Sequence, residues 1–375
     1  MDTQRTAVLQ HFGFDPSVVE QLVKVLSREL PSAFPNPSQF PLGNELFVPD
    51  WINCCMEAKR LGAVVALRNM LFELNFPIAE GISATREYRQ TGPACGVEGL
   101  EPWKKHALGE PTWEAPDRIK IFLHDTGCGL IPVIRAGVHA DFATIVRAIM
   151  HSNEPVPVAS SMGSSFIRGY QNKKRYLRIR EALAMGVISP ESRDPQLWKD
   201  QFILLSSGDY SGVPASSMGL ESAAWLELST RLRLHHESCH YIIRRLYPRL
   251  RFGLQDELIA DFAGLMEVRG NFRAAEFLLF MGLEKFPAYR SGGRLENYPR
   301  ELEGGKEMAQ AMGRLLVDAS EHLESFFATW DPTRFQQEKL RVLAILTWLP
   351  LEILASPQSG QVLGEMLAPA NITSI

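Results

Sequence analysis

Two histidines and a glutamate between residues 236 and 240 have the spacing of a metal-binding helix. The segment His236-Glu237-Ser238-Cys239-His240 places two imidazoles four residues apart. On an α-helix, residues four apart lie on the same face, about one turn along, so both rings can reach a single ion. Zinc binds imidazole nitrogens at about 2.0–2.1 Å, which this spacing permits. We therefore expect a zinc site on this helix.

Glu237 lies one step round the same helix from His236. From there its carboxylate can reach a water molecule at the open position of the metal without being a ligand, as a general base requires. The flanking sequence is apolar and helical, with Leu232, Leu234, Ile242, Ile243 and Leu246. A buried helix that carries these polar groups is costly unless the groups have partners.

A catalytic zinc site needs a third protein ligand and keeps one position for water. Pro248 and Gly253 predict a turn, after which a second helix begins near Leu254. Such a hairpin would return Glu257 toward the two histidines as the third ligand. Asp261 shares the face of Glu257 and could accept a hydrogen bond from the outer nitrogen of a ligating histidine.

The pattern His236-Glu237-x-x-His240 followed by Glu257-x-x-x-Asp261 resembles the gluzincin branch of the zincin zinc metallopeptidases. The resemblance covers residues 236–261 of the 375. It implies that the two histidines and Glu257 bind zinc, that Glu237 activates water and that Asp261 orients a histidine.

The same resemblance leaves the third ligand open, because the interval between His240 and Glu257 is short for the branch. Asp256 and Asp261 therefore remain alternatives to Glu257. Cys239 lies off the face of the histidines, and we expect it to pack in the interior.

Zincin sites also use a strand that pairs with a peptide substrate and a group that polarises the developing oxyanion. The candidate strand is 202–206, just before the helix of the motif. The oxyanion candidates are Tyr289 and Tyr298, on either side of a glycine-rich turn, with Arg294 in that turn as an alternative.

The composition excludes several classes of protein. The chain has 45% hydrophobic and 22% charged residues, enough apolar material for a sizeable core. A net charge of −4 argues against a nucleic-acid partner recruited by charge. Five cysteines without a C-x-x-C pair argue against a disulfide scaffold or a zinc ribbon.

The compartment follows from two further observations. The first residues show no basic and apolar leader, so a secretory signal is not expected. The most apolar stretch, 342–351, is half the length that crosses a bilayer. We expect a reduced, cytoplasmic protein without membrane contact.

The hydrophobic pattern predicts an α+β fold with two unlike halves. The first half is mixed and holds a small sheet, and the second is mostly helical and carries the His-Glu-x-x-His helix. Expected strands are 119–123, 131–134 and 202–205. Expected helices are one that starts after Asp15, then 50–74, 141–150 with Asp141 as N-cap, 173–185, 219–247, 254–268, 272–284, 300–328 and 332–348.

Three regions are expected: a helical and irregular region over 1–117, a small mixed α/β region over 118–218, and a helical metal-binding region over 219–375. Within the first, residues 76–116 are rich in Gly, Pro, Thr and Ser and form a long irregular segment, which is a common property of functional loops.

The sequence thus predicts a zinc-dependent metallohydrolase that is similar to metallopeptidases. A metal-bound water activated by Glu237 would attack a peptide or amide bond of a peptide or of an amide-containing small molecule. Two alternatives stay open. One is a metalloenzyme of small-molecule (secondary) metabolism that uses the same site, with segment 76–116 shaping its pocket. The other is a non-catalytic zincin-like binding protein.

Overall fold

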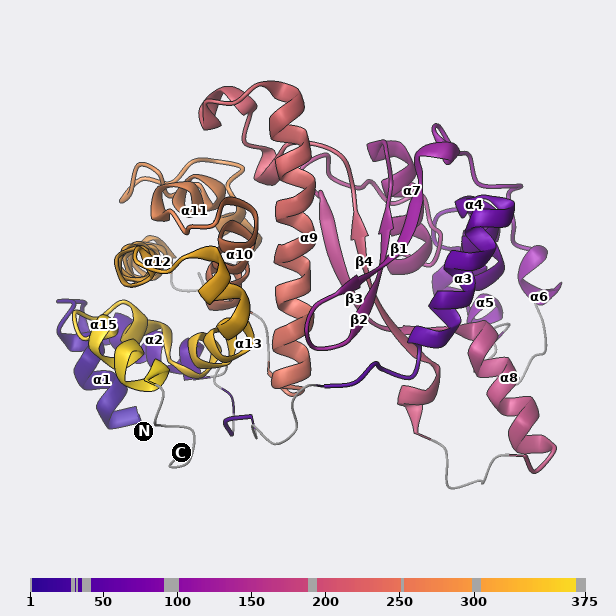
Figure 1. Cartoon of the computed structure of the whole chain (residues 1–375). Coiled ribbons are helices and arrows are strands. Elements are labelled where there is room, and N and C mark those ends of the chain that lie inside the picture. The colour runs from indigo at the N-terminus through magenta and orange to yellow at the C-terminus, as the bar shows by residue number, and fades with distance from the viewer. Residues whose placement is uncertain are drawn as a thin grey trace. The chain divides into compact units, whose positions relative to one another are not determined.

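The computed structural model describes residues 2–27, 31, 33–35, 42–90, 101–187, 194–250, 253–298 and 305–368. Contacts divide the chain into two compact units (Figure 1). The first combines Met1–Leu42 with Asp209–Ile375, and the second is Gly43–Gly208. The three regions expected from sequence stay a prediction. The α+β class is confirmed, since a small mixed sheet is combined with a mostly helical C-terminal half.

The second unit contains a four-stranded sheet in the order β1-β2-β4-β3. Its strands are β1 (Lys120–Asp125), β2 (Leu130–Arg135), β3 (Ser164–Gln171) and β4 (Lys199–Leu205). The β1/β2 and β3/β4 pairs are antiparallel, and β2/β4 is parallel. Sequence patterns located β1, β2 and β4 but missed β3, whose residues do not alternate cleanly between polar and apolar.

The place of β4 in the sheet corrects the expectation that 202–206 could pair with a peptide substrate. Residues 203–205 pair with β2 on one side, and the same residues pair with β3 on the other. A strand with partners on both sides has no backbone edge left for a third chain. β4 is therefore not a substrate-binding edge.

The helices of the second unit are short. They are α3 (Val48–Leu61), α4 (Ala63–Met70), α5 (Arg86–Gln90), α6 (Glu101–Lys104), α7 (His139–Met150) and α8 (Lys173–Ala184), with the 3-10 turns η3 (Phe72–Asn75), η4 (Ile82–Ala84), η6 (Pro116–Arg118) and η7 (Pro195–Trp198). The single helix predicted over 50–74 is wrong. Gly62 has φ +91°, which ends α3 and turns the chain into α4.

The described part of the segment 76–116 contains η4, α5 and α6 among irregular residues. Residues 91–100 of this segment lie outside the described residues. The predicted role of Asp141 as an N-cap is also wrong. Asp141 lies inside α7, and its buried carboxylate accepts hydrogen bonds from the backbone N–H groups of Glu114 (2.7 Å) and Ala115 (3.0 Å).

The core of the second unit joins helices α3, α4 and α7 to one face of the sheet. Trp51 of α3 is fully buried, and its ring centre lies 5.1 Å from that of Phe202 in β4. Phe202 and Leu204 are two apart, so they point to the same face, and both belong to this core. Each such buried side chain contributes roughly 1.5–3 kcal/mol.

A network of buried hydrogen bonds and ion pairs joins α3, β4 and the start of α8. Asp200 of β4 accepts hydrogen bonds from Trp51 Nε1 (2.9 Å), Asn172 Nδ2 (2.9 Å) and Arg175 Nη1 (2.5 Å). Arg175 also donates from Nε to Asp50 of α3 at 2.6 Å. One strand and two helices are thus held by a single carboxylate.

The first unit is helical throughout its described residues, which contain no strand. Its helices are α1 (Asp2–Gln10), α2 (Pro16–Leu26), α9 (Ser222–Leu246), α10 (Leu254–Arg269), α11 (Ala274–Met281), α12 (Gly305–Phe327), α13 (Pro332–Trp348), α14 (Leu351–Leu354) and α15 (Ser359–Leu367), with the 3-10 turns η8 (Tyr210–Gly212), η9 (Ala215–Met218) and η10 (Arg294–Asn297).

Aspartate caps start two of these helices, and only the one at Asp15 is among the positions expected from the sequence. Asp15 accepts from the Ser17 N–H at the start of α2, and Asp331 accepts from the Arg334 N–H at the start of α13. A buried ion pair between Arg5 of α1 and Glu352 of α14 joins two helices far apart in sequence, and Arg5 also donates to Ser27 Oγ at 3.0 Å. Within the described residues, none of the helices has both the length and the hydropathy that a bilayer crossing demands.

Replacement of Asp200 by Ala tests the polar network of the second unit. The change leaves the buried donors of Trp51 and Asn172 without this acceptor, and Arg175 keeps Asp50 and the Phe47 carbonyl. We expect the free energy of unfolding to fall by about 3 kcal/mol, measured by urea denaturation. Asp117→Ala, at an exposed aspartate of the same unit, should change it by less than about 0.5 kcal/mol. Equal effects would contradict this account of Asp200.

Candidate metal centre

A helical hairpin of α9 and α10 carries the candidate site (Figure 1). α9 ends where the Tyr247 N–H donates to the Ile243 carbonyl, and α10 begins at Gly253. The Gly253 N–H donates to the side chain of Asp256 at 2.8 Å. Asp256 therefore caps α10, and this carboxylate is occupied at the helix start.

The two helices approach each other closely at Gly264 of α10. A Cβ atom at this position would lie 3.4 Å from the Leu232 carbonyl oxygen and 3.7 Å from the His236 nitrogen, both in the backbone of α9. These are ordinary van der Waals distances, so the two helices pack closely at this point, with space for no more than a small side chain. Cys239 also faces α10, with its thiol 3.7 Å from the Ile259 carbonyl oxygen.

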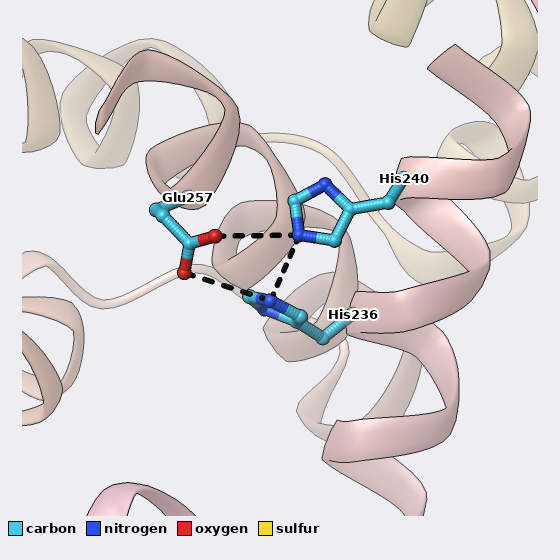
Figure 2. Close-up of side chains that lie close together, drawn as sticks. All are labelled: His236, His240 and Glu257. Atoms are coloured by element: carbon cyan, nitrogen blue, oxygen red, sulfur yellow. Dashed lines mark hydrogen bonds and ion pairs between the residues drawn. The ribbon is translucent and has the colours of Figure 1, made fainter. Parts of the chain in front are cut away.

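His236, His240 and Glu257 converge in the space between the helices (Figure 2). His236 Nε2 lies 3.1 Å from His240 Nε2 and 3.6 Å from Glu257 Oε2, and His240 Nε2 lies 3.4 Å from Glu257 Oε1. All three residues are buried, at 5%, 8% and 9% exposure. The two ring planes are nearly perpendicular, at 85°.

The other nitrogen of His236 is held by Asp261 and Tyr210. His236 Nδ1 lies 2.8 Å from Asp261 Oδ1, and the Tyr210 hydroxyl donates to the same oxygen at 2.5 Å. A carboxylate only accepts hydrogen bonds, so we assign the proton of neutral His236 to Nδ1. The lone pair on Nε2 then faces His240 and Glu257.

Tyr210 is a site residue that sequence reasoning missed. It lies in η8, 26 residues before His236, and its ring packs against Phe280 with centres 4.9 Å apart. Its backbone N–H donates to Ser229 Oγ of α9 at 3.0 Å. No spacing rule connects a tyrosine in an upstream turn with a helix motif, so the sequence carried no signal for this contact.

Arg294 is the cation of the cluster. Its guanidinium forms an ion pair with Asp261, lies 3.6 Å from Glu257 Oε2 and donates to the Tyr210 hydroxyl at 3.1 Å. The oxyanion role expected of Arg294 stays a prediction; its guanidinium contacts these carboxylates, the Tyr210 hydroxyl and, at 3.7 Å, the sulfur of Met281. Burial opposes its charge, but Asp261, Tyr210 and Glu257 outweigh burial and raise the pKa of Arg294.

The cluster favours positive charge at its centre. Burial opposes the charged form of His236, but Glu257 and Asp261 outweigh burial and raise the pKa of this imidazole. Burial also favours the neutral acid at Glu257, yet His236, His240 and Arg294 outweigh it and lower the pKa of that carboxyl. The lone pairs that attract a proton here are those that would attract a metal cation.

Of the other residues predicted for the site, Glu237 and Tyr298 lie at the cluster and Tyr289 does not. Glu237 lies in α9 between the histidines and is 7% exposed. Tyr298 lies beside the cluster, and burial and the nearby Glu257 carboxylate raise the pKa of its phenol. Tyr289 is 52% exposed, and within the described residues it has no hydrogen bond to the cluster.

Comparison with known proteins gives a family. Residues 7–358 match a family described as "Family of unknown function (DUF7005)", which is most of the chain. The chain belongs to the DUF7005 family. Neither the curated proteins nor the solved structures contain a match to it. The DUF7005 match includes every residue of the candidate metal centre, together with the whole of the second unit.

Replacement of Arg294 by Met tests its role as the balancing cation. The variant keeps a long side chain but leaves Asp261 and Glu257 buried without their positive partner. We expect the metal-free protein to lose about 3 kcal/mol in free energy of unfolding, measured by urea denaturation in the presence of a chelator.

Arg290→Met is the matched control four residues earlier. Arg290 forms an ion pair with Glu284, and both side chains are partly exposed, at 38% and 23%. Solvent screens such a pair, and Arg290 also donates to the Leu279 carbonyl at 2.7 Å, so its loss should cost about 1–1.5 kcal/mol, well below the cost expected at Arg294. If both variants lose the same stability, Arg294 does not carry the charge balance proposed for it.

Proposed function

We propose that this DUF7005 chain is a zinc-dependent hydrolase with His236, His240 and Glu257 as its metal ligands. The observation that carries the proposal is the set of donor distances. Ligands at about 2.0–2.1 Å in a tetrahedron lie about 3.3 Å apart. The three separations here are 3.1, 3.4 and 3.6 Å, all close to that edge length.

The chemistry of the donors favours zinc of the catalytic kind. Two imidazole nitrogens and one carboxylate oxygen form a ligand set that occurs in catalytic zinc sites, where three protein ligands leave one position open for water or substrate. The thiol of Cys239 packs toward α10, and the carboxylates of Asp256 and Asp261 serve a helix cap and His236. These contacts support Glu257 as the third ligand.

Glu237, Asp261 and Tyr298 each have a part in the proposed reaction. When bound, zinc supplies a Lewis acid that makes a water molecule more acidic. Glu237 accepts the proton of the attacking water and passes it to the leaving nitrogen. Asp261 keeps the proton of His236 on Nδ1, so that Nε2 presents its lone pair. Tyr298 is the better placed of the two tyrosines to donate to an oxyanion, since it lies beside Glu257.

The bond attacked is a peptide or amide bond in this proposal. A non-peptidase metalloenzyme of small-molecule metabolism is a second candidate that one observation favours. β4, the strand expected to align a peptide, has partners on both of its sides. An amide-containing small molecule needs no such strand.

The proposed setting is the reduced cytoplasm. The four cysteines among the described residues, Cys54, Cys55, Cys128 and Cys239, are free thiols. Free buried thiols are typical of reducing compartments. The near balance of acidic and basic residues supports a small or peptide substrate over nucleic acid, and the proposal includes no membrane partner.

Zinc content and the Glu237→Gln variant test the function together. The purified protein should contain one zinc ion, measured by elemental mass spectrometry. Glu237→Gln should keep that zinc but lower hydrolysis of a fluorogenic peptide and amide panel by about 10²–10⁴-fold, since only the general base is lost.

The controls separate the possible failures. His236→Ala should lose zinc, whereas His235→Ala, at the neighbouring histidine outside the cluster, should keep it. Protein without stoichiometric zinc would contradict the metal site. Full activity in the Glu237→Gln variant would contradict the general base. Stoichiometric zinc without hydrolysis of the panel would support a non-catalytic binding protein.

Asp261→Asn tests how His236 is oriented. An amide at this position can donate to Nδ1 and move the proton of the ring to Nε2, where it blocks the lone pair. We expect zinc affinity to fall about 10–100-fold, measured by competition with a chromophoric chelator. An unchanged affinity would show that Asp261 does not set the tautomer.

A further inference from the structure

The second unit contains a cavity of about 510 Å³ that the zinc proposal does not use. It lies along β3 and the end of α7, and Glu73, Trp103, Tyr170 and Lys173 are part of its lining. A volume between about 300 and 1,000 Å³ is typical of small-molecule sites. The cavity is therefore large enough for a small ligand.

Three ionisable side chains form a chain of contacts in this lining. Lys173 at the start of α8 forms an ion pair with Glu73 of η3, and the Tyr170 hydroxyl of β3 donates to the second carboxylate oxygen. Glu73 and Tyr170 are 6% and 7% exposed. Asn153 also donates to the Glu73 backbone carbonyl and ties this turn to the chain after α7.

A bulge in β3 brings these residues together. The register with β4 shifts between Arg168 and Tyr170, and Gly169 between them has φ +68°. In a regular strand, residues two apart share a face. Here the register shift at Gly169 breaks that pattern: Tyr170 is buried against Glu73, whereas Arg168, in the same cavity lining, is exposed.

Lys173 has the surroundings of a reactive amine. Its side chain is only 23% exposed, and its nitrogen lies 4.5 Å from the centre of the Trp103 ring. Burial lowers the pKa of Lys173 to about 8. A lysine that is neutral more often than usual, next to a carboxylate that can carry its proton, is suited to nucleophilic attack.

We propose that Lys173 forms an imine with a small carbonyl compound bound in this cavity, and that Glu73 transfers the protons. Lys173 first passes one proton to the Glu73 carboxylate. The amine nitrogen then bonds to the carbonyl carbon, and one N–H proton moves to the carbonyl oxygen to give a carbinolamine.

The second half of the reaction removes water. Glu73 returns its proton to the carbinolamine hydroxyl, the C–O bond breaks, and a protonated imine remains on Lys173. An ammonium and a carbonyl thus give an iminium and one water, without an oxidant or a reductant. Tyr170 positions the Glu73 carboxylate for both transfers through its hydrogen bond.

The charge of the lining selects the ligand class. The charged groups of the described lining are one carboxylate, Glu73, and two cations, Lys173 and Arg168. Their sum is one positive charge, which favours a ligand with one negative charge. The proposed ligand is therefore a carbonyl compound that carries a carboxylate, such as a 2-oxo acid.

Reductive trapping tests the proposal on the full-length protein. The chain is incubated with pyruvate and cyanoborohydride, and the labelling rate of each lysine is followed by peptide mass spectrometry. Lys173 should be labelled at least about ten-fold faster than Lys174, its exposed neighbour in α8, because only Lys173 lies beside Glu73 in this cavity. Equal rates at the two lysines would overturn the proposal and leave Lys173 as a structural ion pair.

Two variants and an uncharged carbonyl compound test the roles of Glu73 and Arg168 and the proposed class of ligand. Glu73→Gln should slow labelling of Lys173 about a hundredfold, whereas an unchanged rate would remove Glu73 from the reaction. Hydroxyacetone, which has no carboxylate, should label Lys173 more slowly than pyruvate, and Arg168→Gln should abolish this difference. If both probes react equally with the unaltered protein, the proposed ligand class is wrong.

Discussion

The contact between His236 of α9 and Asp261 of α10 is the interaction on which the candidate centre depends. It joins the two helices across a buried interface and decides which nitrogen of His236 faces the ligand space. One turn beyond Asp261, the two helices are in van der Waals contact at Gly264. One turn before Asp261, Glu257 completes the triangle with the two histidines.

The same contact explains why the site includes residues from outside the hairpin. A carboxylate buried at Asp261 needs more than one imidazole to offset the loss of water. Tyr210, from a turn before α9, and Arg294, from a turn after α11, supply the additional donors. Four separate segments of the first unit thus meet at one pair of oxygen atoms, which makes the site a product of tertiary packing.

The sequence predicted those parts of the molecule that local patterns determine. The helices α9, α10 and α13 follow from apolar periodicity, and the hairpin that returns Glu257 follows from the turn at Gly253. Features set by distant partners were missed or misplaced. β3 is shaped by its bulge opposite β4, Asp141 accepts from a loop 26 residues upstream, and Tyr210 is recognised only by its contacts with His236 and Asp261.

The division of the chain has a consequence for its synthesis. The first unit is assembled from the first 42 residues and from residues after 208, and the ion pair between Arg5 and Glu352 closes it over 347 positions. The second unit is one uninterrupted stretch, so all of its contacts are available to a growing chain much earlier. Helices α1 and α2 can pack against each other early, but their contacts with α12 and α14 form only after those helices have been synthesised. Such a long loop closure is slow and leaves apolar surface exposed while the first unit assembles, so the second unit is free to fold before the first.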